Sequence, residues 1–361
     1  MEEEESQKLH PEEDTLPTVV ASTDSAASSP SGRPPWLKRY LGILLALCAS
    51  LLFPLTGLLV KTLVKTYHPF NVAFWRFQGI LLPAIPMALC RPSAKKDGKK
   101  NKNIFAPITS GEDAAQNRVL LVLRGLAGAS ALVFQFYSLR YITIADSSVI
   151  SFSTPVWVTL LAHVTLGEAC SVMTILAGVL SLAGVLIISR PPMLTGQESW
   201  DGDTLIGVAL ALGCMVCATS TFVILRRLRT MSYALLNLFF GIWGSLETLF
   251  LSALIWTFSP PMNWWDGGLA IALGVLSFIS QLCMTLSFKY ETAGVISLIR
   301  TLDVIFTFIW QYLVFQVVPD RFSVIGAIIV LTGIGLVGVR KWLTELDPQD
   351  PRRKRFALLL I

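Results

Sequence analysis

Residues 39–60 of the chain read RYLGILLALCASLLFPLTGLLV, an apolar run long enough to cross a bilayer as one helix. Spanning a hydrocarbon layer of ~30 Å takes ~20 helical residues. Residues 204–225 read TLIGVALALGCMVCATSTFVIL, and a shift of 165 positions places Gly42 of the first run on Gly207 of the second. The two runs therefore predict membrane helices that begin two similar halves of the chain.

Eight further runs of comparable length and composition lie along the chain. Together the runs give ten expected transmembrane helices, at about 39–60, 70–90, 119–139, 144–166, 172–189, 204–225, 233–257, 267–288, 292–315 and 322–339. Because each half holds an odd number of crossings, the second half enters the membrane upside down relative to the first. The expected fold is all-α and integral to the membrane, with ten transmembrane helices arranged as two inverted five-helix repeats.

A second internal match supports the two repeats. A shift of 146 positions places Gln135 on Gln281 and the tripeptide Val-Ile-Ser at 149–151 on the same tripeptide at 295–297. Two matches in the same order are harder to obtain by chance than either alone. The expected organisation is an acidic disordered cytosolic tail at 1–38, a first repeat at 39–190, an outer connection at 191–203, a second repeat at 204–340 and a basic cytosolic tail at 341–361.

The composition agrees with a membrane protein. The 361 residues are 53% hydrophobic and only 15% charged, and the mean hydropathy is +0.62. Residues 1–38 differ, because they are acidic and rich in Ser, Ala and Pro and cannot bury enough apolar surface to fold. They lack the basic start and short apolar core of a signal peptide, so the first helix is expected to insert uncleaved.

The distribution of Lys and Arg predicts the orientation. With a cytosolic amino end, the inner segments hold 20 of these residues and the outer connections hold 5. The positive-inside rule then places both termini in the cytosol. The net charge of +5 is explained by this topology, so nucleic-acid binding is not expected. The sequence leaves open whether this multi-pass protein resides in the plasma membrane or in the endoplasmic reticulum or Golgi.

Four motifs indicate a family. They are IADSSVISFSTPV at 144–156, LGE at 166–168, RPP at 190–192 and RTLDV at 300–304. With the five-plus-five helices, these motifs resemble the EamA-type repeats of the drug/metabolite transporter superfamily, and most of all solute carrier family 35, subgroup G, over roughly residues 40–340. The resemblance implies a ten-helix carrier that works by alternating access. It leaves the solute open, because relatives move nucleotide sugars, amino acids, organic anions and other metabolites.

Three arginines lie within the apolar spans: Arg76, Arg124 and Arg300. Each costs ~2.5–3.5 kcal/mol at a helix centre on the insertion scale, so each needs a partner, water or the interface. Arg300 is eight residues into the ninth span, or ~12 Å at ~1.5 Å per residue, close to the bilayer midplane. Arg76 and Arg124 are closer to the ends of their spans, where a long side chain can extend to the headgroups.

The ninth span, taken as one continuous helix, carries Ser297, Arg300 and Asp303 on one face, because they are spaced by three. Similar polar faces follow the eighth span at Gln281 and the third at Gln135, and we expect the three faces to converge. The shift of 146 also places Thr154 on Arg300. The expected substrate-binding residues are Arg300, Arg76, Arg124, Gln281, Gln135, Ser297 and Thr154.

A guanidinium in a low dielectric suits a carboxylate or a phosphate. The sequence therefore favours a small organic anion as substrate, with a di- or tricarboxylate such as citrate as the most concrete choice. Two alternatives stay open at this point. Arg300 pairs with Asp303 for structural reasons alone, or the carrier moves nucleotide sugars or other metabolites.

The coupling of transport is less evident. A proton-driven carrier needs a titrating group in the membrane, and the acidic candidates for coupling or charge balance are Asp303, Glu247 and Asp146. His163 is a fourth candidate, although it lies at a span end. Facilitated diffusion or exchange is equally compatible with the sequence. Pro155, inside the fourth span, is the expected hinge, because proline bends a helix.

Other classes of protein fit less well. The chain has no phosphate-binding Gly-rich loop, and its Cys214-x-x-Cys217 pair lies on an apolar helix without a second pair, so we expect no enzyme, no cofactor and no metal. A scaffold or regulator that keeps the carrier fold is the remaining rival. Its basic segments at 95–102 and 352–355 would attract anionic lipids of the inner leaflet. The sequence also leaves a homodimer open.

Overall fold

The computed structural model describes residues 35–89, 105–109, 113–138, 141–142, 147, 150–151, 153–168, 172–189, 202–316 and 321–345. The chain divides after Lys38 into a short amino-terminal unit and a second unit, Arg39–Ile361, which holds the packed helices.

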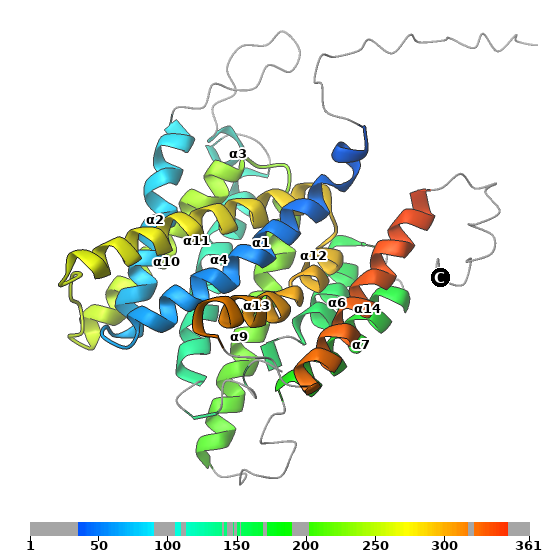
Figure 1. The fold of residues 1–361 in the computed structure, drawn as a ribbon. Helices are drawn as coiled ribbons and strands as arrows, with labels where there is room; N and C mark the ends of the chain where they lie inside the picture. The colour runs from blue at the N-terminus through cyan, green and yellow to red at the C-terminus, as the bar shows by residue number, and fades with distance from the viewer. Residues whose placement is uncertain are drawn as a thin grey trace, which may run out of the picture. The chain divides into compact units, whose positions relative to one another are not determined.

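Every element of regular structure in these described segments is a helix (Figure 1). The helices are α1 (Pro35–Leu63), α2 (Pro69–Leu89), α3 (Ala106–Thr109), α4 (Ala114–Ser138), α6 (Thr154–Leu166), α7 (Val172–Ser189), α9 (Gly202–Arg227), α10 (Tyr233–Leu254), α11 (Trp264–Tyr290), α12 (Ala293–Ile299), α13 (Leu302–Phe315) and α14 (Arg321–Glu345).

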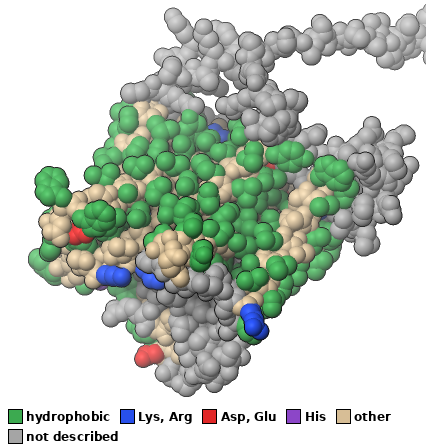
Figure 2. Space-filling model, in the orientation of Figure 1, with side chains coloured by type: hydrophobic (Ala, Val, Ile, Leu, Met, Phe, Trp, Pro, Cys, Tyr) green, Lys and Arg blue, Asp and Glu red, His purple; other side chains and the backbone are tan. Residues whose placement is uncertain are grey.

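The helices are those of a multi-pass membrane protein. Seven stretches are long and apolar enough to cross a membrane: those within α1, α2, α4, α9, α10 and α11, and the combined stretch Ala293–Val314. Three shorter apolar helices, Thr154–Leu166, Val172–Ile188 and Val324–Arg340, occupy the other expected spans. Figure 2 shows hydrophobic side chains over most of the described surface on the face in view. Each expected span overlaps a helix, and the number of ten crossings stays a prediction.

The contacts between helices are paired across the two halves of the chain. Helix α2 packs on α10, and α7 packs on α14, so equivalent helices of the two expected repeats lie side by side. Helix α2 also packs on α11, and α4 packs on α10, which are equivalent contacts under an exchange of the repeats. This arrangement agrees with two related halves.

Glycines permit the closest of these contacts. A Cβ added to Gly79 of α2 would lie 2.0 Å from the Cα of Gly274 of α11, so neither helix tolerates a side chain there. In the α7–α14 pair, a Cβ on Gly184 would lie 2.7 Å from the carbonyl oxygen of Gly326. Small residues of this kind let membrane helices approach backbone to backbone.

The ninth span is not the continuous helix that the sequence predicted. It is divided at Arg300 and Thr301, between α12 and α13. The amide of Thr301 donates to the carbonyl of Leu298 at 3.0 Å, and the amide of Asp303 donates to that of Arg300 at 3.1 Å. These bonds span three residues instead of four, which is the tighter 3₁₀ pattern that often marks a hinge.

In the fourth span, the described residues 147, 150 and 151 are helical, and a turn at Ser153 precedes helix α6. Helix α6 begins at Thr154, and the amides of Ser153 and Val156 make bonds three residues back. Pro155 therefore occupies the first turn of α6, where its missing donor leaves no bond broken, and it does not bend a helix interior as expected. Its role as a hinge stays a prediction. The shift of 146 relates the two turns, because it places Thr154 on Arg300.

The largest buried apolar cluster joins α1, α6, α9, α10, α11 and α12. Phe288 and Ile296 at its centre are fully buried, as are Leu235 and Val158. This packing joins helices of both halves of the chain.

Candidate functional site

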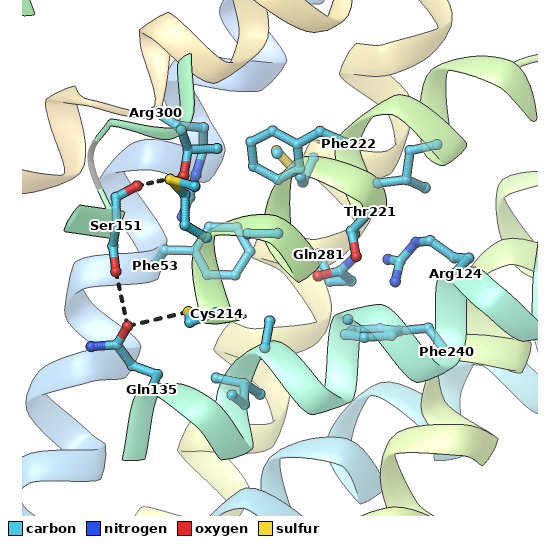
Figure 3. A pocket seen from close by; sticks show the side chains of 18 of the residues that line it. Phe53, Arg124, Gln135, Ser151, Cys214, Thr221, Phe222, Phe240, Gln281 and Arg300 are labelled. Atoms are coloured by element: carbon cyan, nitrogen blue, oxygen red, sulfur yellow. Dashed lines mark hydrogen bonds between the residues drawn. The ribbon is translucent and has the colours of Figure 1, made fainter. Parts of the chain in front are cut away.

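The candidate site is a cavity of about 280 Å³ between the helices. Its walls come from α1, α2, α4, α6, α9, α10, α11 and the turn between α12 and α13 (Figure 3). Six of the seven expected substrate-binding residues line it: Arg76, Arg124, Arg300, Gln135, Gln281 and Thr154. The structure therefore brings together residues that are far apart in the sequence.

Arg124 is the most deeply buried of the three arginines. Its side chain is 1% exposed, and the guanidinium carbon lies 4.1 Å from the centroid of the Phe240 ring. The nitrogens Nε and Nη1 have no hydrogen-bond partner among the described groups. Arg124 therefore lies against α10 in the cavity wall, and its role in substrate binding stays a prediction.

Arg300 and Arg76 share an aromatic neighbour. The guanidinium carbon of Arg300 lies 4.1 Å from the centroid of the Phe53 ring, and that of Arg76 lies 5.8 Å from the same ring. A cation over an aromatic face is stabilised by the ring quadrupole, which offsets part of the cost of burial. Phe53 thus holds two positive charges at one end of the cavity.

Arg300 pairs with Asp303 and also lines the cavity. The two groups form an ion pair with 2.5 Å between Nη2 and Oδ2. The second terminal nitrogen, Nη1, is buried and has no hydrogen-bond partner among the described groups. The structural pairing considered from the sequence is therefore present, and it leaves one donor of Arg300 free for a solute.

The charge of the cavity is strongly positive. Its described lining holds three arginines and no aspartate or glutamate. Asp303 offsets one of the three charges from outside the lining. Buried charges without partners are costly in a low dielectric. A negatively charged occupant would remove that cost.

Polar groups cover one wall. Ser151 donates to Oε1 of Gln135 at 3.0 Å, and the thiol of Cys214 donates to the same atom at 3.3 Å (Figure 3). The amide nitrogen of Gln135 donates to Ser147 at 2.8 Å, so the orientation of this side chain is fixed. Thr221 faces the cavity with a buried hydroxyl that has no partner in the described structure.

Other expected residues lie elsewhere. Ser297 is 2% exposed, and its hydroxyl donates to the carbonyl of Gly294 at 2.8 Å, so it lies outside the cavity lining. Glu247 accepts a hydrogen bond from Ser130 at 3.1 Å between α10 and α4, also outside the lining. Asp146 lies outside the described residues.

Sequence reasoning missed the apolar part of the lining. Phe53, Phe222, Phe240, Met215 and Met284 all contribute to the cavity wall. In an apolar span, residues that face a cavity and residues that pack on a neighbouring helix are of the same apolar types. The pattern alone therefore carried no signal for them.

Two polar networks tie helix ends that the expected topology places on opposite sides of the membrane. On one side, Arg226 pairs with Glu168 at 2.6 Å and donates to the carbonyl of Phe288 at 2.8 Å. The second carboxylate oxygen of Glu168 accepts the amide of Ala293 at 3.2 Å. We call these four groups the Arg226 clamp. It joins the ends of α6, α9, α11 and α12 that the topology expects on the cytosolic side.

The second network joins helix ends that the topology expects on the other side. Asn71 at the start of α2 donates to the carbonyl of Thr257 at 2.5 Å and accepts from Ser252 at 2.7 Å. Tyr67 donates to Asp266 of α11 at 2.9 Å. The helix ends that the expected topology places on the non-cytosolic side of the membrane therefore contact each other.

Comparison with known proteins identifies the family. The model of the EamA-like transporter family matches residues 40–190 and, a second time, residues 205–339. The chain belongs to the EamA-like transporter family. Within it, the chain is 30% identical over 309 residues to the human protein named solute carrier family 35 member G1, covering 84% of this chain and 80% of that protein. This places it with solute carrier family 35, subgroup G.

More distant relatives share the length of the chain. The pseudopaline exporter CntI of Pseudomonas aeruginosa is 26% identical over 80% of this chain and 93% of its own. The probable transport protein YPL264C of Saccharomyces cerevisiae is 27% identical over 84% of this chain and 90% of its own. A solved crystal structure aligns with a TM-score of 0.69 at 16% identity, over 85% of this chain and 100% of its own, which shows a shared fold. The protein is a membrane transporter.

Proposed function

We propose that this EamA-like transporter is a secondary carrier of a small organic anion. One observation carries the proposal: three arginines converge on a single cavity whose described lining has no acidic side chain. A guanidinium offers a planar set of donors that fits a carboxylate, and the fit strengthens away from water. The free nitrogens of Arg124 and Arg300 provide such donors on the two sides of the cavity.

The separation of the charges supports an anion with two ends. In Figure 3, Arg300 and Arg124 lie at opposite ends of the lining, with Phe53 and Phe222 between them. We propose a dicarboxylate for this arrangement, with one carboxylate at each guanidinium. A tricarboxylate such as citrate is the next candidate, with Arg76 beside Arg300 as the third positive group.

The size of the cavity supports a small solute. Its volume of about 280 Å³ is at the lower limit of pockets that bind drug-sized ligands, which is roughly 300–1,000 Å³. A nucleotide sugar is longer than a dicarboxylate and carries a base that needs its own subsite. We therefore rank nucleotide sugars as the alternative substrate class, and a non-transporting scaffold or regulator below them.

Alternating access supplies the mechanism of this proposal. Two inverted halves, 39–190 and 204–340, would rock around the cavity, with both termini cytosolic. The Arg226 clamp would close the cytosolic side in this conformation. The turn at Arg300 and the start of α6 at Pro155 are the proposed hinges. Asp303, Glu247 and Asp146 are the groups that would couple transport to a proton or balance charge.

Uptake into proteoliposomes tests the proposal. Purified protein would be reconstituted and supplied with labelled succinate, citrate, a nucleotide sugar or a neutral amino acid. We expect uptake of succinate and citrate, loss of this uptake in Arg300→Ala and Arg124→Ala, and normal uptake in the control variant Arg321→Ala at an exposed helix end. Accumulation of the nucleotide sugar alone would replace the anion proposal with its alternative. Uptake of none of these solutes by the unmodified protein would favour the scaffold. Anion uptake that Arg300→Ala and Arg124→Ala leave unchanged would contradict the binding role of these arginines.

A further inference from the structure

One side chain separates the cavity from a second hollow. Met215 of α9 lines the cavity with the arginines, and it also lines a groove of about 330 Å³ between α6 and α9. The groove is formed by Trp157, Leu160, Leu161, Val164, Met215, Val216, Thr219 and Ser220. Met215 is the residue that the two linings share, so at this point the wall between them is a single side chain.

The groove lies on the outer surface of the helices. Val164 is 80% exposed, Val216 is 56% exposed and Trp157 is 51% exposed. In a membrane these side chains contact the acyl chains of lipids. A path from the bilayer towards the arginines therefore leads along the groove and ends at Met215.

The wall residue is adaptable. Met215 is 6% exposed, and its sulfur accepts a hydrogen bond from Ser153 at 3.0 Å, just before α6. Methionine is unbranched and changes rotamer at low cost. The contact that holds it here is therefore a weak one, to a thioether sulfur. A change of its rotamer would join the groove to the cavity.

A polar group in the groove has no partner. Thr219 lines the groove with a side chain that is 5% exposed, and its hydroxyl makes no hydrogen bond within the described structure. A buried hydroxyl without a partner is destabilising. An acyl chain offers no acceptor for it, whereas a solute with an ester, ether or hydroxyl oxygen does. The groove can therefore accommodate a solute that carries a hydrogen-bond acceptor, as well as the acyl chain of a lipid.

The cavity itself is also suited to apolar groups. Phe53, Phe222, Phe240 and Met284 form much of its wall, beside the arginines. A small polycarboxylate has no apolar group to pack against this surface. An anion with an apolar part would cover it and gain the corresponding hydrophobic free energy.

From this geometry we infer that the cavity and the groove form one site for an amphipathic organic anion. Its carboxylates bind at Arg124 and Arg300, and its apolar substituent extends past Met215 into the groove. Met215 then sets the largest substituent that the carrier accepts. The inference rests on the proposed function, because it needs the anion at the arginines, and it specifies the class of that anion.

The test compares two dicarboxylates that differ by one apolar group. Full-length protein in proteoliposomes would be assayed with labelled succinate and labelled 2-benzylsuccinate. We expect the benzyl compound to reach half-maximal uptake at a concentration about tenfold or more lower, which is the size of effect that small apolar groups produce in pockets. Unlabelled 2-benzylsuccinate should also compete with succinate for uptake.

Three variants locate the effect. Val216→Trp fills the groove from the lipid side at a position that is not part of the cavity lining. It should weaken the binding of 2-benzylsuccinate severalfold, measured as the half-saturating concentration, and leave that of succinate unchanged. Met215→Ala should widen the opening and favour 2-benzylsuccinate further. Met284→Ala is the matched control, because Met284 lines the cavity and not the groove. It should change both substrates alike.

The outcomes separate the two proposals. Succinate uptake that depends on Arg300, with Val216→Trp and Met215→Ala changing both substrates equally, would overturn the amphipathic site and leave the anion carrier in place. The same holds if 2-benzylsuccinate neither enters nor competes, in which case the groove holds only lipid. Absence of uptake of either anion by the unmodified protein would overturn both.

Discussion

Arg124 lies over the ring of Phe240 with no carboxylate paired to it in the described structure. The contact with the Phe240 ring offsets part of the cost of burying the Arg124 charge. It also joins α4 of the first half of the chain to α10 of the second. A buried cation held this way lowers the stability of the empty protein. It also provides a strong attraction for an anion.

Replacing Arg124 should separate stability from transport. We expect Arg124→Met to raise the midpoint of thermal unfolding of the purified protein, because it removes an uncompensated buried charge and keeps an apolar contact with Phe240. Uptake of the anion should fall about 100-fold or more, as expected for the loss of a charge-assisted contact worth ~3 kcal/mol. Fluorescence-monitored melting and proteoliposome uptake measure the two effects. A variant that melts earlier would show that Arg124 is structural.

The ion pair of Arg300 and Asp303 should show coupling in a double-mutant cycle. The pair is partly buried, with side-chain exposures of 22% and 13%, and removing one partner of such a pair is destabilising because it leaves the other charge alone. We therefore expect Asp303→Ala to lower the melting temperature more than the double variant Arg300→Ala, Asp303→Ala does. The single variant Arg300→Ala completes the cycle, and effects of the two single variants that add up to that of the double variant would mean that the pair contributes nothing to folding. Neither variant should transport the anion normally, because Asp303 positions Arg300.

The Arg226 clamp should control access to the cavity from its own side. Cys214 lines the cavity and can report access to it in a chain whose other cysteines are replaced by alanine. Glu168→Gln weakens the contacts to Arg226 and Ala293, so a membrane-impermeant thiol reagent applied to that side should label Cys214 faster.

A charge exchange provides the control for the clamp. The double variant Glu168→Arg, Arg226→Glu keeps an ion pair at the same place, so its labelling rate should lie between those of the unmodified protein and Glu168→Gln. Labelling that is equally slow in all three proteins would show that the clamp is not the barrier.

The contact of Gly79 with Gly274 should tolerate no side chain. A Cβ at Gly79 would lie 2.0 Å from the backbone of α11, so Gly79→Ala has to separate two helices. We expect a large loss of monodisperse protein in detergent, measured by size-exclusion chromatography. Gly57→Ala is the matched control, because no atom lies within 4 Å of a Cβ at that position. Its yield should equal that of the unmodified protein.

Much of the fold could be read from the sequence, because hydropathy and length decide where a helix spans a membrane. The start of α2 at Pro69 and the end of α7 at Ser189 lie within one residue of their expected positions. The break at Arg300 could not be read, since Thr301 and Leu302 carry no helix-breaking residue type. It arises from three-residue hydrogen bonds whose stability depends on neighbouring helices.

The candidate site was predicted in its charges and missed in its apolar parts. Arg76, Arg124 and Arg300 stood out because charge is rare and costly inside a span. Ser297 was included because it shares a helical face with Arg300, but its hydroxyl is bonded within its own helix. Phe53 and Met215 could not be selected from the sequence. In an apolar span, the residue type does not show whether a side chain lines a cavity or packs on a neighbouring helix.

Glu168 divides its two carboxylate oxygens between the side chain of Arg226 and the backbone of Ala293. A movement that withdraws Glu168 from α9 and α12 loses both contacts in one step, since they share one rigid group. Barriers built this way break abruptly, so partly open forms are sparsely populated. A resting carrier closed by this clamp would leak few ions, and the voltage across its membrane would be preserved between transport events.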